Sequence, residues 1–387
     1  MNLTSRLNSP WGVTLTVAAL FFLFICGRLF QAHFDFSSFI VAGDQFSDPS
    51  HTPEGLTVLR NSRGYDGQFY YRLALNPFTS QMTEFGITLD GAGYRQQRIF
   101  YPALASIFSL GRADFLPFMM IFINFTALGA LGWIGASYAQ LAGRSAVWGI
   151  FLPLHPAFLF SLSRNLVEIL QITLILGSLL LLRRGKSLAA TALLVFAILT
   201  KETALLVAAA ALFVYLIQRW QGKDDEVIPP YYFALPMLVF VCWQGILFYH
   251  WGASPHGGTS NRLLGLPLAG PAALLLEASK FETSFHRRCF AELVFLLIFA
   301  LGVLYHLRAT AILRVLVISC LLFGALAVSL NREVWIEDWG FFRAVSQFCA
   351  LGTVVLITSD VKAKGWILGC SGFFWLFLVE RLMRHYS

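Results

Sequence analysis

The sequence predicts an all-α fold, a polytopic transmembrane helix bundle of about 11 to 12 spans. The 387-residue chain is 57% hydrophobic and only 13% charged, whereas charged residues make up about a quarter of a soluble protein. Apolar runs of about 15 to 25 residues, long enough to approach or complete a bilayer crossing, recur along the chain. No internal repeat divides it, so we expect a single membrane domain over residues 1–387.

The candidate spans follow the apolar windows of the sequence. They cover residues 11–30, 115–139, 146–162, 166–182, 187–200, 204–218, 232–250, 289–306, 310–330, 343–359 and 366–383. No small-residue cleavage site follows the first span, so we expect an uncleaved anchor rather than a signal peptide. A further run, 98–111, contains Pro102 and is only about 13 residues long, which predicts a re-entrant or short helix buried in protein.

The first loop, residues 31–114, is the longest connection between predicted spans. Loops of this length are usually functional. Within it, Gln68, Arg72 and Asn76 recur every four residues, which predicts a short amphipathic helix that ends at Asn76-Pro77. We expect this helix to lie flat at the membrane interface with its aromatic side chains toward lipid.

The basic residues indicate which way the chain crosses the membrane. The net charge is +7, but lysines and arginines are scattered through short loops, which argues against a nucleic-acid partner. With the N-terminus inside, Arg144, the 183–186 run and Lys364 fall in cytoplasmic loops, as positive inner loops require. The 31–114 loop and Lys201-Glu202 then face outward. The six cysteines form no C-x-x-C pair, so we expect neither zinc nor a disulfide framework.

Asp66 is the first candidate catalytic residue, a lone carboxylate in the aromatic stretch 65–71 just beyond the first span. As a helix N-cap it would accept free backbone N–H groups. As a functional group it would take the proton of an acceptor hydroxyl, or hold a divalent cation (Mg or Mn) that neutralises a phosphate leaving group. Tyr65, Gln68 and Tyr70 are expected to support it. Asp44 is either a second carboxylate of the site or a solvated loop residue.

Four further segments carry charges at the outer ends of predicted helices. Arg95 and Arg98 precede the short helix, where they either bind phosphate oxygens bidentately or reach lipid headgroups. Arg164 and Glu168 lie four residues apart, which suits either a self-contained pair or a site. The 201–202 pair separates two short apolar runs and favours a polar site. Arg343, before a span, suits a lipid phosphate or simple headgroup contact. The candidate site residues in these four segments are Arg95, Arg98, Glu168, Lys201, Glu202 and Arg343.

The sequence motifs of several common enzyme classes do not occur in the chain. The chain contains no H-E-x-x-H, P-loop, G-x-G-x-x-G or G-x-S-x-G sequence. This argues against a membrane zinc protease, an NTPase or a hydrolase of the usual kinds. An enzymatic function would therefore depend on the carboxylates and basic residues.

Four short segments of the chain follow one another in an order typical of a known family. They are Tyr65-Asp66-Gly67-Gln68-Phe69-Tyr70, Phe100-Tyr101-Pro102-Ala103-Leu104, Ser163-Arg164-Asn165-Leu166-Val167-Glu168 and Leu199-Thr200-Lys201-Glu202-Thr203. With these segments the chain resembles the multi-span glycosyltransferases of the GT-C superfamily, in particular bacterial proteins similar to the PIG-V mannosyltransferases. It also resembles uncharacterised bacterial membrane proteins of cell-surface glycopolymer formation. It departs from the family pattern in two places: the first loop has no Asp-Asp or Asp-Glu doublet, and Glu168 lacks a preceding aromatic-Thr.

The resemblance implies sugar transfer from a polyprenyl-phosphate donor to a cell-envelope glycan or lipid acceptor. The protein would lie in a bacterial inner membrane with its active site facing the periplasm or exterior. Asp66 and Glu168 would be catalytic, and Arg98, Lys201 and Arg343 would hold the donor phosphate. The alternatives are a transporter or flippase of a lipid-linked glycan, which should carry charges near mid-span on several helices, or a non-catalytic component of glycopolymer export.

Overall fold

The computed structural model describes residues 8–222, 228–255, 263–306, 314–336, 340–359 and 364–384. Six helical segments in this part of the chain are long and apolar enough to cross a membrane, so the protein is a multi-pass membrane protein with an all-α bundle. They are α2 (Pro10–Gln31), α6 (Leu116–Leu141), Glu202–Trp220 with α10 (Leu205–Trp220), α11 (Tyr231–Trp251), α13 (Ser284–His306) and α18 (Lys364–Arg384).

Shorter helices complete the bundle. They are α8 (Glu168–Arg183), α9 (Ser187–Thr200), α12 (Ala269–Ala278), α14 (Arg314–Val328) and α17 (Ser346–Thr358). A 14-residue helix such as α9 rises about 21 Å, less than the roughly 30 Å of a hydrocarbon core. The α8 helix is central, because it packs against α6, α9 and α17. The predicted 11 to 12 spans therefore include helices too short to cross on their own.

The prediction of one span over residues 146–162 is wrong, because this segment is divided. A 3-10 helix, η2 (Ala146–Phe151), is followed by a break and then α7 (Pro156–Leu162). Pro156 is the first residue of α7, and the Nδ1 atom of His155 accepts the backbone N–H of Ala157. A proline at that position starts a helix but cannot continue one, which explains the division.

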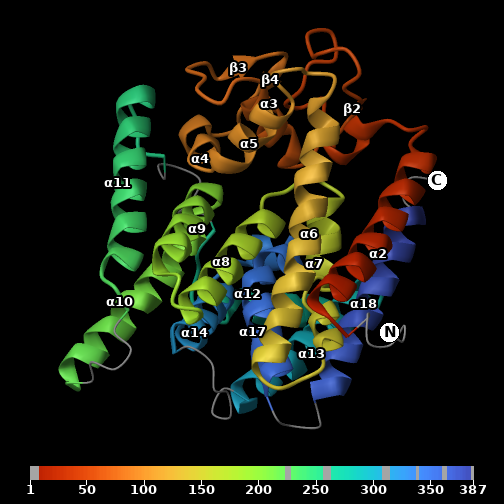
Figure 1. Ribbon diagram of the computed structural model, residues 1–387. Coiled ribbons are helices and arrows are strands. Elements are labelled where there is room, and N and C mark those ends of the chain that lie inside the picture. Colours follow the sequence, from red (N-terminus) through yellow and green to blue (C-terminus); the bar gives the residue numbers. More distant parts are fainter. Residues whose placement is uncertain are drawn as a thin grey trace.

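The first loop folds into a compact unit that we call the first-loop module, residues 32–114. Figure 1 shows it gathered at one end of the helices. Its two strand pairs are short, β1 with β2 parallel and β3 with β4 antiparallel. Its elements are η1 (Phe36–Phe39), β1 (Ala42–Gly43), β2 (Val58–Leu59), α3 (Gly67–Leu75), β3 (Thr83–Glu84), β4 (Ile87–Thr88), α4 (Ala92–Gln96) and α5 (Phe100–Phe108).

The predicted helix after Asp66 forms, but its predicted place at the lipid interface is wrong. Residues Gly67 to Ala74 of α3 are all buried, including the aromatic side chains expected to face lipid. The helix packs against α5, α6 and the β1 and β4 strands. The α5 helix is the short helix expected within 98–111; its nine residues rise only about 14 Å.

The opposite end of the bundle carries the basic residues that were assigned to the cytoplasmic side. The α6 helix starts beside the module, where the Tyr101 hydroxyl donates to the carbonyl of Met120, and its 26 residues rise about 39 Å. Arg144 follows its far end. The guanidinium of Arg184 lies over the ring of Trp133, and the ammonium of Lys364 over Trp148, in the far half of the bundle.

Candidate functional site

The four segments that carry the family resemblance meet at the module end of the bundle. Gly67 lies against the backbone of Arg164, and the rings of Tyr70 and Tyr101 make an edge contact at 6.1 Å. Lys201 reaches Glu168 across 33 positions of the sequence. We call the resulting set of ion-paired side chains the charged cluster; it comprises Asp66, Asp90, Arg95, Arg98, Glu168, Lys201, Glu202 and Arg343.

Asp66 precedes α3 but does not cap it. Its side chain makes no capping hydrogen bond, and both carboxylate oxygens face arginines instead. Oδ1 lies 3.0 Å from Nη1 of Arg95, and Oδ2 lies 2.6 Å from Nη2 of Arg343. Burial raises the pKa of the Asp66 carboxyl, but Arg343 and Arg95 outweigh it and hold that pKa well below its usual range. Asp66 is thus ionised, and it joins the first-loop module to α16 (Gly340–Ala344), the short helix that carries Arg343.

The absence of a side chain at Gly67 allows this placement. A Cβ atom there would clash with the carbonyl oxygens of Ile40 and Arg164. The backbone of the next residue after Asp66 therefore lies directly against the turn before α8. This contact brings Asp66 close enough to share a partner with Glu168.

Glu168, the first residue of α8, is completely buried. Its Oε1 atom accepts from Lys201 Nζ at 2.9 Å and from Arg343 Nε at 2.6 Å. Its Oε2 atom has no hydrogen-bond partner. A buried carboxylate oxygen without a partner is costly, so Oε2 is an atom at which a substrate hydroxyl or a water would be stabilising.

Arg98 and Glu202 form a second, bidentate pair in the cluster. Nε of Arg98 donates to Oε2 of Glu202 at 2.9 Å, and Nη2 donates to Oε1 at 2.6 Å. The hydroxyls of Tyr70 and Tyr94 accept the other hydrogen bonds of this guanidinium. Arg98 therefore holds the turn before α10. Its side chain is only 4% exposed, whereas those of Arg343 and Lys201 are 15% and 12% exposed, so these two cations are the more accessible to a ligand.

Several residues of the site were not predicted from the sequence. Gln171, one turn after Glu168, donates to the carbonyl of Lys201 and to the Thr203 hydroxyl. Gln347 in turn donates to Gln171 at 2.7 Å. Asp90 holds Arg95 through two bonds of 2.7 Å. For Gln171 and Gln347 the sequence did contain a signal, an amide side chain inside an otherwise apolar span, because a buried polar group needs a hydrogen-bond partner.

The aromatic and amide residues predicted to support Asp66 have different roles. The Tyr65 ring lies beneath the guanidinium groups of Arg343 and Arg164, at 5.5 and 5.3 Å. Tyr70 contacts Arg98. Gln68 points the other way, where its Oε1 accepts from the backbone of Gly43 and from Ser47. Gln68 therefore stabilises the module rather than the charged cluster.

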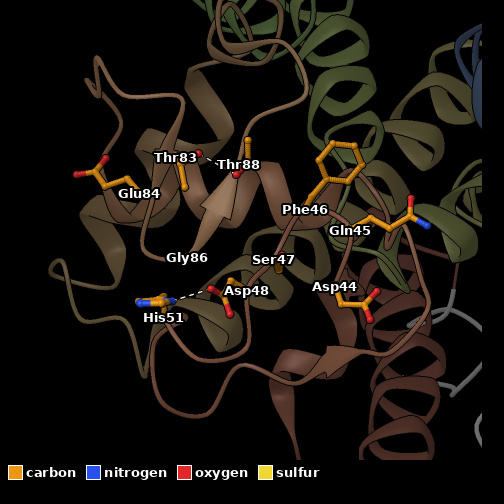
Figure 2. A pocket seen from close by; sticks show the side chains of 10 residues that line it. All are labelled: Asp44, Gln45, Phe46, Ser47, Asp48, His51, Thr83, Glu84, Gly86 and Thr88. Atoms are coloured by element: carbon orange, nitrogen blue, oxygen red, sulfur yellow. Dashed lines mark hydrogen bonds and ion pairs between the residues drawn. The ribbon is translucent and has the colours of Figure 1, made fainter.

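The structure does not bring Asp44 into the charged cluster. Its exposed carboxylate accepts the backbone N–H groups of Asn61 and Ser62 at 2.7 and 3.0 Å. These bonds lower the pKa of Asp44. Figure 2 shows it at the edge of a surface hollow, among residues of the β3–β4 hairpin and the 44–51 segment. Asp44 is therefore a turn residue of the module.

The residues around Asp66 do not fit a divalent cation. Both of its oxygens are held by guanidinium groups, and Arg98 adds further positive charge nearby. In the described part of the chain, no three His, Cys, Asp or Glu side chains come together as metal ligands do. A divalent cation at Asp66 would have to displace one of its two guanidinium partners, so we assign no metal to this site.

The charged cluster is electrically balanced. Four carboxylates (Asp66, Asp90, Glu168, Glu202) face four cations (Arg95, Arg98, Lys201, Arg343), so its formal charge is zero. An anionic ligand would therefore compete with a carboxylate for a cation. Arg343 is the cation for which this competition matters most, because it bridges Asp66 and Glu168.

No family model, curated protein or solved structure matches the chain.

Proposed function

We propose that the protein is a membrane glycosyltransferase that moves a sugar from a polyprenyl-phosphate donor to a cell-envelope glycan or lipid acceptor. The observation that supports this most is the charged cluster itself. Carboxylates suited to proton transfer and cations suited to phosphate come from five separate segments and meet at one end of an apolar bundle. A lipid-phosphate substrate needs both features, at the depth where its headgroup lies.

In this proposal the donor phosphate is held by Arg343 and Lys201. Guanidinium matches phosphate oxygens in two-point contacts, and ammonium acts as a point charge. Arg98 would contribute only by releasing part of its bond to Glu202. Fixed cations are most effective at the leaving group, because negative charge accumulates there as the sugar–phosphate bond breaks.

Asp66 is the proposed proton acceptor for the hydroxyl that attacks the sugar. When Arg343 turns to the phosphate, Oδ2 of Asp66 loses one of its two cationic partners and becomes a better base. The acceptor oxygen then bonds to the anomeric carbon, the bond from that carbon to the phosphate oxygen breaks, and the proton passes to Asp66. One in-line displacement inverts the configuration of the sugar. Glu168 holds Lys201 and Arg343 in place.

Reconstitution tests this function. We expect the purified protein in proteoliposomes to transfer label from one or more polyprenyl-phosphate hexoses, with inverted configuration in the product, and not from nucleotide sugars. Transfer from a nucleotide sugar alone would contradict the donor class. Movement of an intact lipid-linked glycan across the bilayer without transfer would instead favour the flippase alternative.

The proposed location is the bacterial inner membrane, with the charged cluster facing the periplasm or exterior. The basic residues at the far end of the bundle support this orientation through the bias of positive charge toward cytoplasmic loops. The partners would be the bilayer, the lipid donor and the acceptor. A flippase is less well supported, because the charged cluster lies at one end rather than along a path through the bundle.

A further inference from the structure

Two buried amide side chains, Gln171 on α8 and Gln347 on α17, are not used in the chemistry proposed above. Nε2 of Gln347 donates to Oε1 of Gln171 at 2.7 Å. Nε2 of Gln171 donates in turn to the carbonyl of Lys201 at 3.1 Å and to the Thr203 hydroxyl at 2.9 Å. Lys201 ends α9 in an extended conformation, so its carbonyl has no continuing helix to bond. The two amides therefore connect α17 to the turn that carries Lys201.

The charged cluster joins the same three parts of the chain. Glu168 lies one turn before Gln171 on α8, and its Oε1 accepts from both Arg343 and Lys201. Arg343 lies on α16, four residues before Gln347 of α17. We call the two connections the ionic link (Arg343, Glu168 and the Lys201 ammonium) and the amide link (Gln347, Gln171 and the Lys201 carbonyl). The α8 helix is in the middle of both and packs against α9 and α17 (Figure 1).

The two links differ in exposure and in charge. The side chains of Arg343 and Lys201 are 15% and 12% exposed, so an anionic ligand can compete for these cations. Gln171 and Gln347 are only 0% and 3% exposed. When a phosphate takes Arg343, the bond from Arg343 to Glu168 opens. The amide link carries no charge and lies out of reach of the phosphate, so it stays closed and continues to hold α17 and the Lys201 turn against α8.

The hydrogen bonds of the amide link run in one direction. A carbonyl oxygen can only accept, so the nitrogen of Gln171 must face Lys201 and its oxygen must face Gln347. Position 347 therefore needs a donor, and the oxygen of Gln347 accepts from the Ser346 hydroxyl at 3.1 Å. Methionine has a similar size but cannot donate. At position 347 it would leave the oxygen of Gln171 buried without a partner.

We propose that Gln171 and Gln347 are positioning residues that keep Arg343 and Lys201 at a fixed separation while a lipid phosphate replaces Glu168 as the partner of Arg343. The inference rests on the proposed function, because it concerns how the donor phosphate is held. The amides act through the backbone of the Lys201 turn and through α17, and they contact neither phosphate nor sugar. Cations that are already fixed lose less freedom on binding, which strengthens binding of the phosphate.

Binding of farnesyl phosphate, a short polyprenyl monophosphate, to the full chain in detergent tests this proposal. We expect Gln347→Met to raise the Kd by about tenfold, the equivalent of one lost buried hydrogen bond. Thr353→Val is the matched control, which should bind normally. Thr353 is as buried as Gln347 on the same helix, and its hydroxyl donates within that helix to the carbonyl of Cys349. In transfer assays, Gln347→Met should raise the donor KM and leave kcat within about twofold, because Asp66 is not part of the amide link.

The Gln171→Met/Gln347→Met double variant keeps the test valid if the single variant does not fold. Replacing both partners by apolar side chains of similar size leaves no orphaned amide, so the bundle should be retained. The Lys201 turn nevertheless loses its connection to α17. We therefore expect the double variant to fold and to show a similar rise in the Kd for farnesyl phosphate.

Hydrogen exchange measures the positioning without any ligand. The backbone amides of residues 201–204 should exchange faster in both amide variants than in the unmodified protein or in Thr353→Val, while exchange elsewhere in the bundle is unchanged. An unaltered Kd with unaltered exchange at 201–204 would overturn the proposal. So would faster exchange spread evenly over all helices, because that pattern reports a loss of stability alone.

The outcomes also separate this inference from the proposed function. If the unmodified protein binds no farnesyl phosphate, the assignment of Arg343 and Lys201 to phosphate is refuted, and this inference with it. Sugar transfer is measured independently. If the variants change binding and exchange as expected but the unmodified protein transfers no sugar, the amide link stands and the glycosyltransferase function is refuted.

Discussion

Arg343 is the residue that joins Asp66, the proposed proton acceptor, to Glu168, which holds the cations in place. Its Nη2 atom lies 2.6 Å from Asp66 and its Nε atom 2.6 Å from Glu168, so one planar group bridges the first-loop module and α8. Only guanidinium has donors in this fork arrangement. An ammonium would keep the charge but serve as one point, and the bridge would be lost.

Replacing Arg343 by lysine should therefore raise the KM for the lipid donor by about tenfold or more, the effect of removing one charge-assisted hydrogen bond. Kinetics of transfer in proteoliposomes measure this effect. Arg112→Lys is the matched control, because Arg112 forms an exposed pair with Asp114 outside the charged cluster. An unchanged donor KM in the Arg343 variant would show that this side chain does not bind the phosphate.

The depressed pKa of Asp66 gives a pH prediction. Stability from a carboxyl whose folded pKa is lowered is fully present above its unfolded pKa of about 3.9 and is lost as the pH falls toward the folded value. Asp66→Asn should therefore lower the melting temperature by the same amount at pH 7 and at pH 5. Thermal unfolding in detergent at both values measures this. A difference that disappears by pH 5 would place the Asp66 pKa near that pH.

At the scale of the element, α3 is the helix on which the position of Asp66 depends. It is buried on all sides, and its close contact with the turn before α8 requires a glycine at position 67. A methyl group there would force the module away from the bundle. At an uncrowded position of a helix, replacing glycine by alanine would instead stabilise the helix, because alanine has the higher helix propensity.

Gly67→Ala should consequently lower the melting temperature and reduce transfer, by separating Asp66 from Arg343. Gly245→Ala is the control, a glycine of α11 with open space where its Cβ would lie. We expect that variant to keep full activity and stability. Thermal unfolding and transfer assays compare the two. Equal behaviour of both variants would contradict the proposed contact at Gly67.

The elements also show which features could be read from the sequence. Long apolar windows predicted α2, α6, α11 and α13 closely, because length and hydropathy are local properties. The lipid-facing position of α3 was wrong, since amphipathic spacing cannot tell lipid from a protein partner on the apolar side. The division of the 146–162 window followed from Pro156, a local signal that the window average concealed.

For the candidate site, too, local features could be predicted from the sequence and long-range contacts could not. Charged residues in apolar surroundings, such as Glu168 and Lys201, were recognisable because they are costly unless paired. Their pairing partners were not, because the contacts join positions more than 30 residues apart. The sequence alone could not show that Asp66 belongs to the charged cluster and Asp44 does not, because it is the fold that directs the Asp44 carboxylate to the backbone of Asn61 instead.

At the scale of the whole molecule, the account requires the first-loop module and the far basic end to lie on opposite sides of the membrane. A cysteine at Ser50, exposed on the module, should react with an impermeant maleimide added to intact cells. A cysteine at Lys186, exposed at the other end, should react only after the membrane is permeabilised. Both are made in a cysteine-free background, because six native cysteines are present. The reverse labelling pattern would invert the orientation.

The measurement that tests the central claim most directly is sugar transfer in proteoliposomes with a panel of labelled polyprenyl-phosphate sugars. The unmodified protein is compared with Asp66→Asn and with Asp114→Asn, which removes an exposed carboxylate outside the charged cluster. The account predicts transfer by the unmodified protein and by Asp114→Asn, and a loss of at least about a hundredfold, the usual effect of removing a proton acceptor, in a folded Asp66→Asn variant. Undiminished transfer by Asp66→Asn, or no transfer by the unmodified protein from any donor, would contradict it.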